Sequence, residues 1–167
     1  MGRGTYFLPS PIIIIIFSNM TTDNINIRLA DNNDYPQLIA LFSEFADFEG
    51  RKEQMTNSVD KMNAESDFFN CLVAEKDGKI IGYVAFFYCY FTWSGKALYM
   101  DDLYITPDYR GKGLGTRFIT MLKEIAAQSG CHIMRWQVAD WNERARAIYK
   151  GIGAVINEED RNCDIIL

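Results

Sequence analysis

The chain has 167 residues, of which 49% are apolar and 23% are charged. This length and composition are typical of one globular domain and exclude a disordered or fibrous protein. Its 22 Asp and Glu outnumber its 17 Lys and Arg, which gives a formal charge of −5. Because an acidic chain repels phosphate backbones and attracts cations, we expect a small cationic partner and no nucleic acid.

Cysteine and histidine usage bears on metal and redox chemistry. The chain has 4 cysteines and 1 histidine. No Cys-x-x-Cys pair is present, which excludes a zinc ribbon and a thioredoxin-type site. A single histidine excludes metal sites that need several. We predict no metal, reduced and mostly buried cysteines, and a structural role for the histidine. These residues are Cys71, Cys89, Cys131, Cys163 and His132.

The first 19 residues differ from the rest of the chain. Their apolar run, Ile12–Phe17, is far shorter than the roughly 20 residues that cross a bilayer, and no small-residue cleavage site follows it. We expect no membrane segment, a cytoplasmic protein, an N-terminal extension over 1–19 and a single domain over 20–167. In an alternative that stays open, the isoleucines form an edge strand, because β-branched residues favour strands.

Beyond Met20 the hydrophobic pattern alternates between the periods of strands and helices. Pro36 in a first turn, Asn142 as a cap and Gly130 as a stop mark helix ends, and Gly78 marks a hairpin turn. The expected strands are 25–30, 71–75, 80–91, 96–105, 132–139, 154–156 and 163–167. One expected helix begins at residue 34, and three others cover about 56–65, 115–129 and 142–151. Helices placed among hairpins predict a mixed α/β sheet.

A glycine-rich loop, 110–115, joins a predicted strand to a predicted helix. It reads Arg-Gly-Lys-Gly-Leu-Gly, so backbone N–H groups and the positive end of the helix converge on one place, which favours an anion. The spacing matches neither a Rossmann fingerprint nor a Walker A loop. A flexible turn remains the alternative, although Arg110, Lys112 and Arg117 concentrate positive charge there.

Two acids interrupt an apolar strand. Asp101 and Asp102 are adjacent, and adjacent strand residues point to opposite faces, so both reach one pocket only if a bulge redirects one of them. Otherwise one lies on a solvated face. Glu49 extends the apolar stripe of the first helix, where it is either part of a site or a surface charge.

The loop resembles a signature of the GNAT acetyltransferase superfamily, Arg/Gln-x-x-Gly-x-Gly/Ala, at residues 109–116. A later Asn…Ala…Tyr…Gly-Ala pattern is matched within 141–154. The segments 68–75, 92–95 and 98–104 are similar to the spermidine/spermine and thialysine N-acetyltransferases. The resemblance covers about 25–167 and implies a GNAT fold, with a mixed, mostly antiparallel sheet splayed at the cofactor cleft and flanked by helices.

The resemblance also implies acetyl-CoA as co-substrate and a homodimer. The backbone of one strand end would pair with the pantetheine arm, the loop would hold the pyrophosphate, and an asparagine would lie near the arm. The residues that it assigns to the cofactor are Leu103, Tyr104, Ile105, Arg110, Gly111, Lys112, Gly113, Leu114, Gly115, Thr116 and Asn142.

For the amine, the resemblance implies a channel lined by Glu49, Trp93, Asp101 and Asp102, with Tyr149 facing the thioester sulfur. Acids suit the chemistry, since an ammonium must be bound and deprotonated before it attacks a thioester. Tyr149 is otherwise an ordinary core tyrosine, and Trp93 a surface aromatic.

We therefore predict an acetyl-CoA-dependent N-acetyltransferase that acts on a primary amine of a polyamine or a lysine-like amino acid such as thialysine, by direct attack in a ternary complex. The alternatives are a non-catalytic acyl-CoA binding module and an acetyltransferase for protein or peptide amines.

Overall fold

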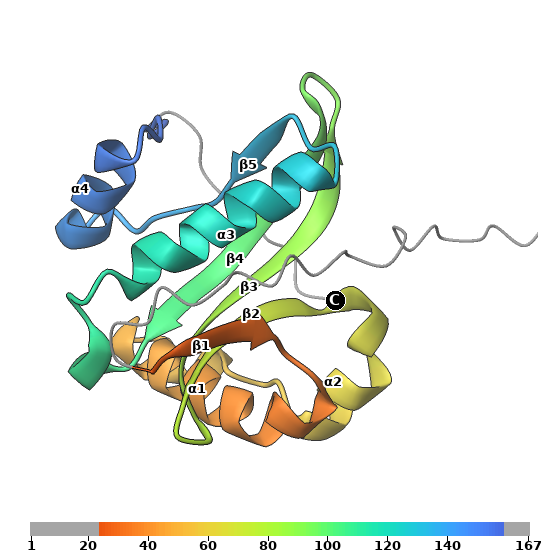
Figure 1. Cartoon of the computed structure of the whole chain (residues 1–167), viewed down its shortest axis with the longest axis vertical. Coiled ribbons are helices and arrows are strands. Elements are labelled where there is room, and N and C mark those ends of the chain that lie inside the picture. The colour runs from red at the N-terminus through yellow and green to blue at the C-terminus, as the bar shows by residue number, and fades with distance from the viewer. Residues whose placement is uncertain (1–23, 159–167) are drawn as a thin grey trace, which may run out of the picture. The chain divides into compact units, whose positions relative to one another are not determined.

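The computed structural model describes residues 24–158, which fall into two compact units that divide between Arg135 and Trp136 (Figure 1). The first unit contains a sheet of five strands in sequence order. They are β1 (Asn26–Leu29), β2 (Asn70–Lys76), β3 (Lys79–Phe91), β4 (Gly95–Ile105) and β5 (Ile133–Arg135). The first four run antiparallel to their neighbours and β5 runs parallel to β4, so the expected mixed, mostly antiparallel sheet is confirmed.

Three helices belong to the first unit, α1 (Tyr35–Phe48), α2 (Val59–Ala64) and α3 (Leu114–Gln128). Figure 1 shows α1 and α2 grouped near β2 and β3, while α3 runs along β4. Short 3-10 turns lie at Asn32–Asp34, Lys52–Gln54, Ser66–Phe68 and Pro107–Tyr109.

Apolar side chains of α1 and α2 form one core with a single face of the sheet. Leu38 and Leu41 of α1 are buried there with Met62 of α2 and Tyr83 of β3. On α3, Phe118, Ile119 and Leu122 form a buried apolar stripe. Burial of a large apolar side chain stabilises a fold by about 1.5–3 kcal/mol, so these stripes fix α1 and α3 in the first unit.

The second unit, described over 136–158, contains one helix, α4 (Glu143–Gly151). The Asn142 side chain accepts a hydrogen bond from the Ala145 N–H at 3.1 Å, which confirms the predicted cap. Arg146 pairs with Asp140 and with Glu158.

Two predicted strands differ from the structure. The strand expected over 132–139 is shorter in the structure, where it comprises only β5 (Ile133–Arg135). Its pairing with β4 ends at Tyr99↔Arg135, and a strand needs a hydrogen-bonded neighbour. The strand expected over 154–156 is wrong. There the Ala154 N–H instead closes the end of α4 by donating to the Tyr149 carbonyl at 2.9 Å. The segment 163–167 and residues 1–19 lie outside the described residues.

The cysteines are less buried than expected. Cys71, Cys89 and Cys131 are free thiols, but only Cys71 is buried and the other two are half-buried. Cys163 lies outside the described residues. His132 is exposed just before β5.

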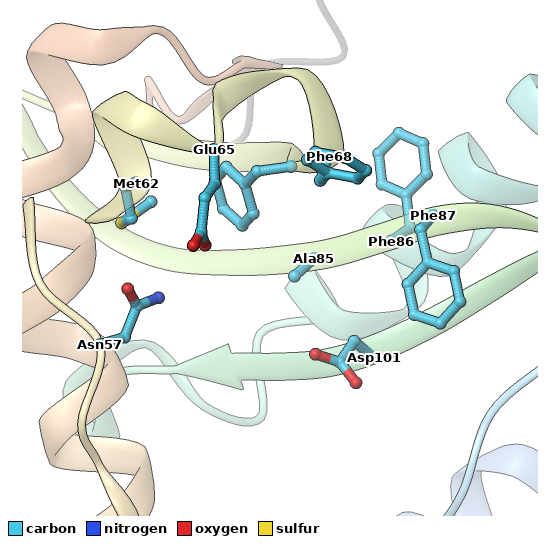
Figure 2. A pocket seen from close by; sticks show the side chains of 9 residues that line it. Asn57, Met62, Glu65, Phe68, Ala85, Phe86, Phe87 and Asp101 are labelled. Carbon is cyan, nitrogen blue, oxygen red and sulfur yellow. The ribbon is translucent and has the colours of Figure 1, made fainter. Parts of the chain in front are cut away.

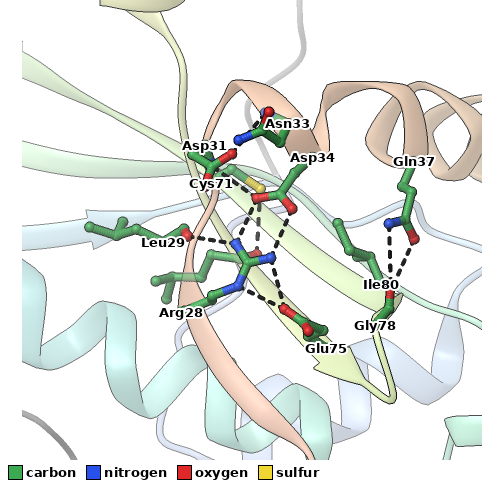
Figure 3. A network of polar contacts seen from close by, with 11 residues as sticks. Arg28, Leu29, Asp31, Asn33, Asp34, Gln37, Cys71, Glu75, Gly78 and Ile80 are labelled. Carbon is green, nitrogen blue, oxygen red and sulfur yellow. Dashed lines mark hydrogen bonds and ion pairs between the residues drawn. The ribbon is translucent and has the colours of Figure 1, made fainter.

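One charged network ties β1 to β2 and to the start of α1 (Figure 3). Arg28 donates to both carboxylate oxygens of the buried Asp34, at 2.6 and 2.8 Å, and to Glu75 at 2.8 Å. Asp34 also accepts from the Asp31 N–H at 2.8 Å. On α1, Gln37 accepts from the Ile80 N–H at 2.9 Å. The network therefore places α1 against the β2–β3 hairpin.

We expect Asp34→Asn to lower the free energy of unfolding at pH 7 by about 2–3 kcal/mol, because it leaves Arg28 without its bidentate partner. The Arg28 hydrogen bonds hold the pKa of Asp34 below its usual range. The contribution of ionised Asp34 to the free energy of unfolding is therefore fully present at pH values above its unfolded pKa of about 3.9. It is lost as the pH falls through the lower pKa of the folded state. Urea titrations at pH 7 and pH 3.5 measure both effects.

Asp47→Asn is the matched control. The Asp47–Lys52 pair spans 3.6 Å and both side chains are about two-thirds exposed, so its loss changes stability by less than about 0.5 kcal/mol. Equal effects of the two variants would contradict a structural role for the Arg28 network.

Candidate active site

An extra residue in β4 brings two carboxylates together. Val84 pairs with Leu103, but Phe86 pairs with Met100. A single β3 residue, Ala85, therefore faces two residues of β4, Asp101 and Asp102. This is a β-bulge. It lies at Asp101 and Asp102, the two acids that can share a pocket only if a bulge redirects one of them.

Both acids lie on the face of the sheet that packs against α1 and α2. Asp101 lines a cavity together with Met62 of α2. Asp102 is two residues from Tyr104, which is buried in the core beneath α1, and residues two apart in a strand share a face. The bulge therefore directs both carboxylates to one side, as a shared pocket requires.

Glu49 completes a group of three acids. It caps the C-terminal end of α1, it is half-buried, and its negative charge contributes to the raised pKa of Asp102. An acid at a helix C-terminus faces the negative end of the macrodipole, and no basic residue lies in the last turn of α1. Helix stability therefore does not explain Glu49, and an acid at this position would favour a bound cation.

Burial and like charges weaken the acidity of the pair. The pKa of Asp102 is raised to about 6, first by burial and then by the charges of Asp101 and Glu49. Burial also raises the pKa of Asp101. Asp102 is thus a carboxyl group that exchanges a proton near neutral pH, which suits a general base.

The glycine loop is the other part of the candidate site. Gly111 and Gly113 have φ of 79° and 77°, a region that L side chains rarely adopt. The first helical hydrogen bond of α3 runs from the Arg117 N–H to the Gly113 carbonyl at 3.1 Å. The N–H groups of 114–116 therefore have no helical acceptor and are available to an anion.

The loop cations do not converge as the sequence predicted. The Arg110 guanidinium stacks over Phe48 and Tyr104 at 4.9 and 5.2 Å, and its Nε donates to the Ile105 carbonyl at 2.8 Å. Arg117 donates to the Ile25 carbonyl at 3.4 Å. Both side chains thus secure the loop. Lys112 is the exposed cation, and its Nζ lies 5.0 Å from the centroid of the Tyr109 ring.

The end of β4 beside this loop has one open edge. Pairing with β5 involves only Ala97–Tyr99, whereas β4 continues to Ile105 and pairs there with β3. Within the described part of the first unit, the other edge of Leu103–Ile105 has no neighbouring strand. An extended ligand with amide groups can hydrogen bond to such an edge.

Three further predicted residues lie elsewhere. Trp93 is fully exposed at the tip of the β3–β4 hairpin. Asp101 lies six positions after Gly95 in the sequence, or about 20 Å along an extended strand. The structure thus does not bring Trp93 to the acids within one chain. Asn142 caps α4 and Tyr149 lies within it, so both belong to the second unit. Tyr149 is half-buried against Trp136, with ring centroids 5.2 Å apart, and burial raises its pKa.

The cavity beside Asp101 was not predicted from the sequence (Figure 2). Its volume is about 210 Å³. The described residues that line it are Asn57, Met62, Glu65, Phe68, Phe69, Ala85, Phe86, Phe87 and Asp101. Most of them precede β2 or lie in the middle of β3, and the hydrophobic pattern treats such residues as core or loop.

Residues 24–158 contain no helix that is both long enough and apolar enough to cross a membrane. Over the same range, no group of His, Cys, Asp and Glu side chains has the arrangement of a metal site.

Comparison with known proteins identifies the family. The sequence profile of the Acetyltransferase (GNAT) family matches residues 35–154. The thialysine N-epsilon-acetyltransferase of Bos taurus is 35% identical over 140 residues, which cover 77% of this chain and 82% of that protein. A human spermidine/spermine N(1)-acetyltransferase-like protein 1 is 31% identical over 144 residues, or 80% of this chain and 21% of that protein.

The fold agrees with solved structures. An acetyltransferase from Clostridium acetobutylicum, solved with acetyl-CoA, has a TM-score of 0.69 at 21% identity and covers 84% of this chain and 96% of its own. The chain belongs to the GNAT family of acetyltransferases, so the resemblance drawn from the sequence is confirmed. It is an N-acetyltransferase.

We expect Asp102→Asn to stabilise the protein increasingly as the pH rises. A carboxyl group whose folded pKa is about 6, against about 3.9 unfolded, destabilises the fold once it must ionise. This penalty develops as the pH rises from about 4 to 6 and is complete above pH 6. The advantage of the variant over wild type should therefore grow by about 1–2 kcal/mol between pH 4.5 and pH 8 in urea titrations.

Asp108→Asn is the control, because Asp108 is exposed in the Pro107–Tyr109 turn. Its effect on stability should be small and nearly independent of pH. A flat pH dependence for Asp102→Asn as well would show that Asp102 is not forced to ionise in an unfavourable environment.

Proposed function

We propose that this chain transfers an acetyl group from acetyl-CoA to a primary amine of a small cationic substrate, a polyamine or a lysine-like amino acid, by direct attack in a ternary complex. The observation that carries the proposal is the β4 bulge, which directs Asp101 and Asp102 to one face beside Glu49. The names of the two relatives, a thialysine and a spermidine/spermine-type acetyltransferase, agree with an amine substrate.

The glycine loop fits the phosphates of acetyl-CoA. A Cβ placed on Gly113 would meet no atom within 4 Å, so open space lies beside the N–H groups that begin α3. The open edge of Leu103–Ile105 is next to this loop in sequence, and it can pair with the amides of the pantetheine arm. In this proposal Lys112 adds the positive charge, Arg110 holds the loop in shape, and Asn142 lies near the arm.

In the reaction, acetyl-CoA supplies the acetyl thioester, and the chain must bind the ammonium and remove its proton. Glu49, Asp101 and Asp102 attract the cation. With a pKa of about 6, the Asp102 carboxylate is ionised at pH 7 and accepts a proton directly or through water. The Tyr149 hydroxyl is the proposed donor to the departing thiolate, since burial raises the pKa of this phenol and it therefore keeps a proton to donate at pH 7.

Thiol release from acetyl-CoA with a panel of amines tests this proposal, and Tyr149→Phe tests its mechanism. We expect wild type to release thiol with primary amines. Tyr149→Phe should reduce kcat about 10²- to 10⁴-fold with little change in stability, because it removes the proton and keeps the ring that packs on Trp136.

Tyr88→Phe is the control. It also removes a phenolic hydroxyl, one that lies 2.8 Å from the Ser129 hydroxyl, but it lies outside the proposed site, so kcat should change less than about twofold. Nearly full kcat in Tyr149→Phe would assign the proton to water. No thiol release with any amine would contradict the proposed function.

Gly113→Val tests the loop. A β-branched side chain blocks the approach of a phosphate and is strained at this φ, so affinity for acetyl-CoA should fall at least about tenfold in calorimetry. Gly130→Val is the matched control at the other end of α3. Gly130 has a φ of 70° and also lies in open space. The Gly130→Val variant should therefore lose a similar amount of stability without losing affinity for acetyl-CoA. Equal affinities of Gly113→Val and Gly130→Val for acetyl-CoA would show that the loop is not part of the site.

A further inference from the structure

The cavity beside Asp101 adds a further carboxylate, that of Glu65, to the acids of the bulge. Asp101 is adjacent to Asp102 in the bulge, and its side chain lines the cavity. The far wall comes from the end of α2 and the turn that follows it, where Glu65 and Phe68 lie. Figure 2 shows the Glu65 carboxylate and the Asp101 carboxylate on different walls, with phenylalanine rings along one end. A molecule in this cavity would thus meet two separate carboxylates.

The walls between these acids suit a hydrocarbon chain. Phe68 is 83% exposed and Phe87 is 40% exposed, although both rings are apolar. Met62, Phe69 and Ala85 add further apolar lining. Methylene groups placed here would cover rings that now face water, which favours binding. The volume of about 210 Å³ is also far above the roughly 10–15 Å³ that one water requires.

The charge of the cavity is of one sign. Its described lining contains Glu65 and Asp101 and no Lys, Arg or His. Glu65 lies in none of the ion pairs of the described residues. A carboxylate-bearing ligand would face repulsion here, and the Asn57 amide could offer it only a neutral donor. An ammonium would be attracted by both acids and by the faces of the rings.

We propose that this cavity binds the far end of the amine substrate and accepts a second ammonium group there, with Glu65 as its partner. The substrate is then a diamine or polyamine and not an amino acid, because the cavity attracts a cation and repels an α-carboxylate. This inference rests on the proposed function. It also departs from the amino-acid substrate in the name of the bovine relative.

Steady-state thiol release with three amines tests the inference. The probes are 1,4-diaminobutane, 1-aminobutane, which has the same chain and lacks the second nitrogen, and L-lysine. We expect wild type to prefer 1,4-diaminobutane to both others in kcat/KM. In Glu65→Gln, the ratio of kcat/KM for 1,4-diaminobutane to that for 1-aminobutane should fall about 5- to 20-fold, because the second ammonium loses its partner.

Asp67→Asn is the matched control, since it removes an exposed carboxylate from the same turn and does not line the cavity. Its ratio should stay within about twofold of wild type. Glu65→Lys is a second variant that reverses the charge, and it should raise kcat/KM for L-lysine relative to 1,4-diaminobutane. Calorimetry of 1,4-diaminobutane binding to each variant gives a readout that does not depend on turnover.

The outcomes separate the two proposals. Equal ratios in Glu65→Gln and Asp67→Asn, or a wild-type preference for L-lysine, would overturn the diamine subsite while acetylation of amines stands. No thiol release with any of the three amines, or with the wider panel, would overturn the proposed function and the subsite with it.

Discussion

One extra residue in β4 is the constraint on which the amine side of the site depends. In a regular strand, Asp101 and Asp102 would point to opposite faces, and one of them would enter the core beneath α3. Because Ala85 faces both residues, the ladder on either side stays intact and both carboxylates lie toward α1 and α2. The backbone hydrogen bonds of β3 and β4 thus hold two like charges together that would otherwise separate.

This arrangement opposes stability, and in the proposed function it serves to bind a cation. Asp102 is affected by two like charges, those of Asp101 and of Glu49 at the negative end of α1, and its pKa is raised to about 6 by burial and by these neighbours. The Tyr83 hydroxyl is buried nearby and has no hydrogen-bond partner among the described residues. Its pKa is raised by burial and then by the charge of Asp102. Such an environment lowers folding stability, and under the proposed function a bound cation would relieve it. The Arg28 network at the opposite end of α1 shows the contrasting case, in which Arg28, Asp34 and Glu75 each have a partner of opposite charge.

The sequence predicted those features that local chemistry determines. Caps and turns placed α1, the β2–β3 hairpin and α4, and the strand period showed that the two acids needed a bulge. Prediction from the sequence failed where a contact with a distant segment determines the local structure. Residues 154–156 are apolar but have no strand to pair with, since the Ala154 N–H closes α4. Arg110 was assigned to an anion by its position, whereas contacts with Phe48 and Tyr104 direct it back to the sheet. The cavity at Glu65 depends on a turn meeting β3, which no short pattern encodes.

The two parts of the proposed site are built from different groups, and this bears on what can vary among relatives. The loop and the edge of β4 would hold the co-substrate through backbone N–H and carbonyl groups, so many side chains are compatible with them provided that glycine permits the turn. The amine side is built from side chains, namely Glu49, the bulge acids and the lining at Glu65 and Phe68. If the cavity takes the far end of the amine, a substitution in the turn after α2 changes the preferred amine without disturbing the sheet or the loop. Under this proposal we expect substrate choice to vary there more readily than at the glycines.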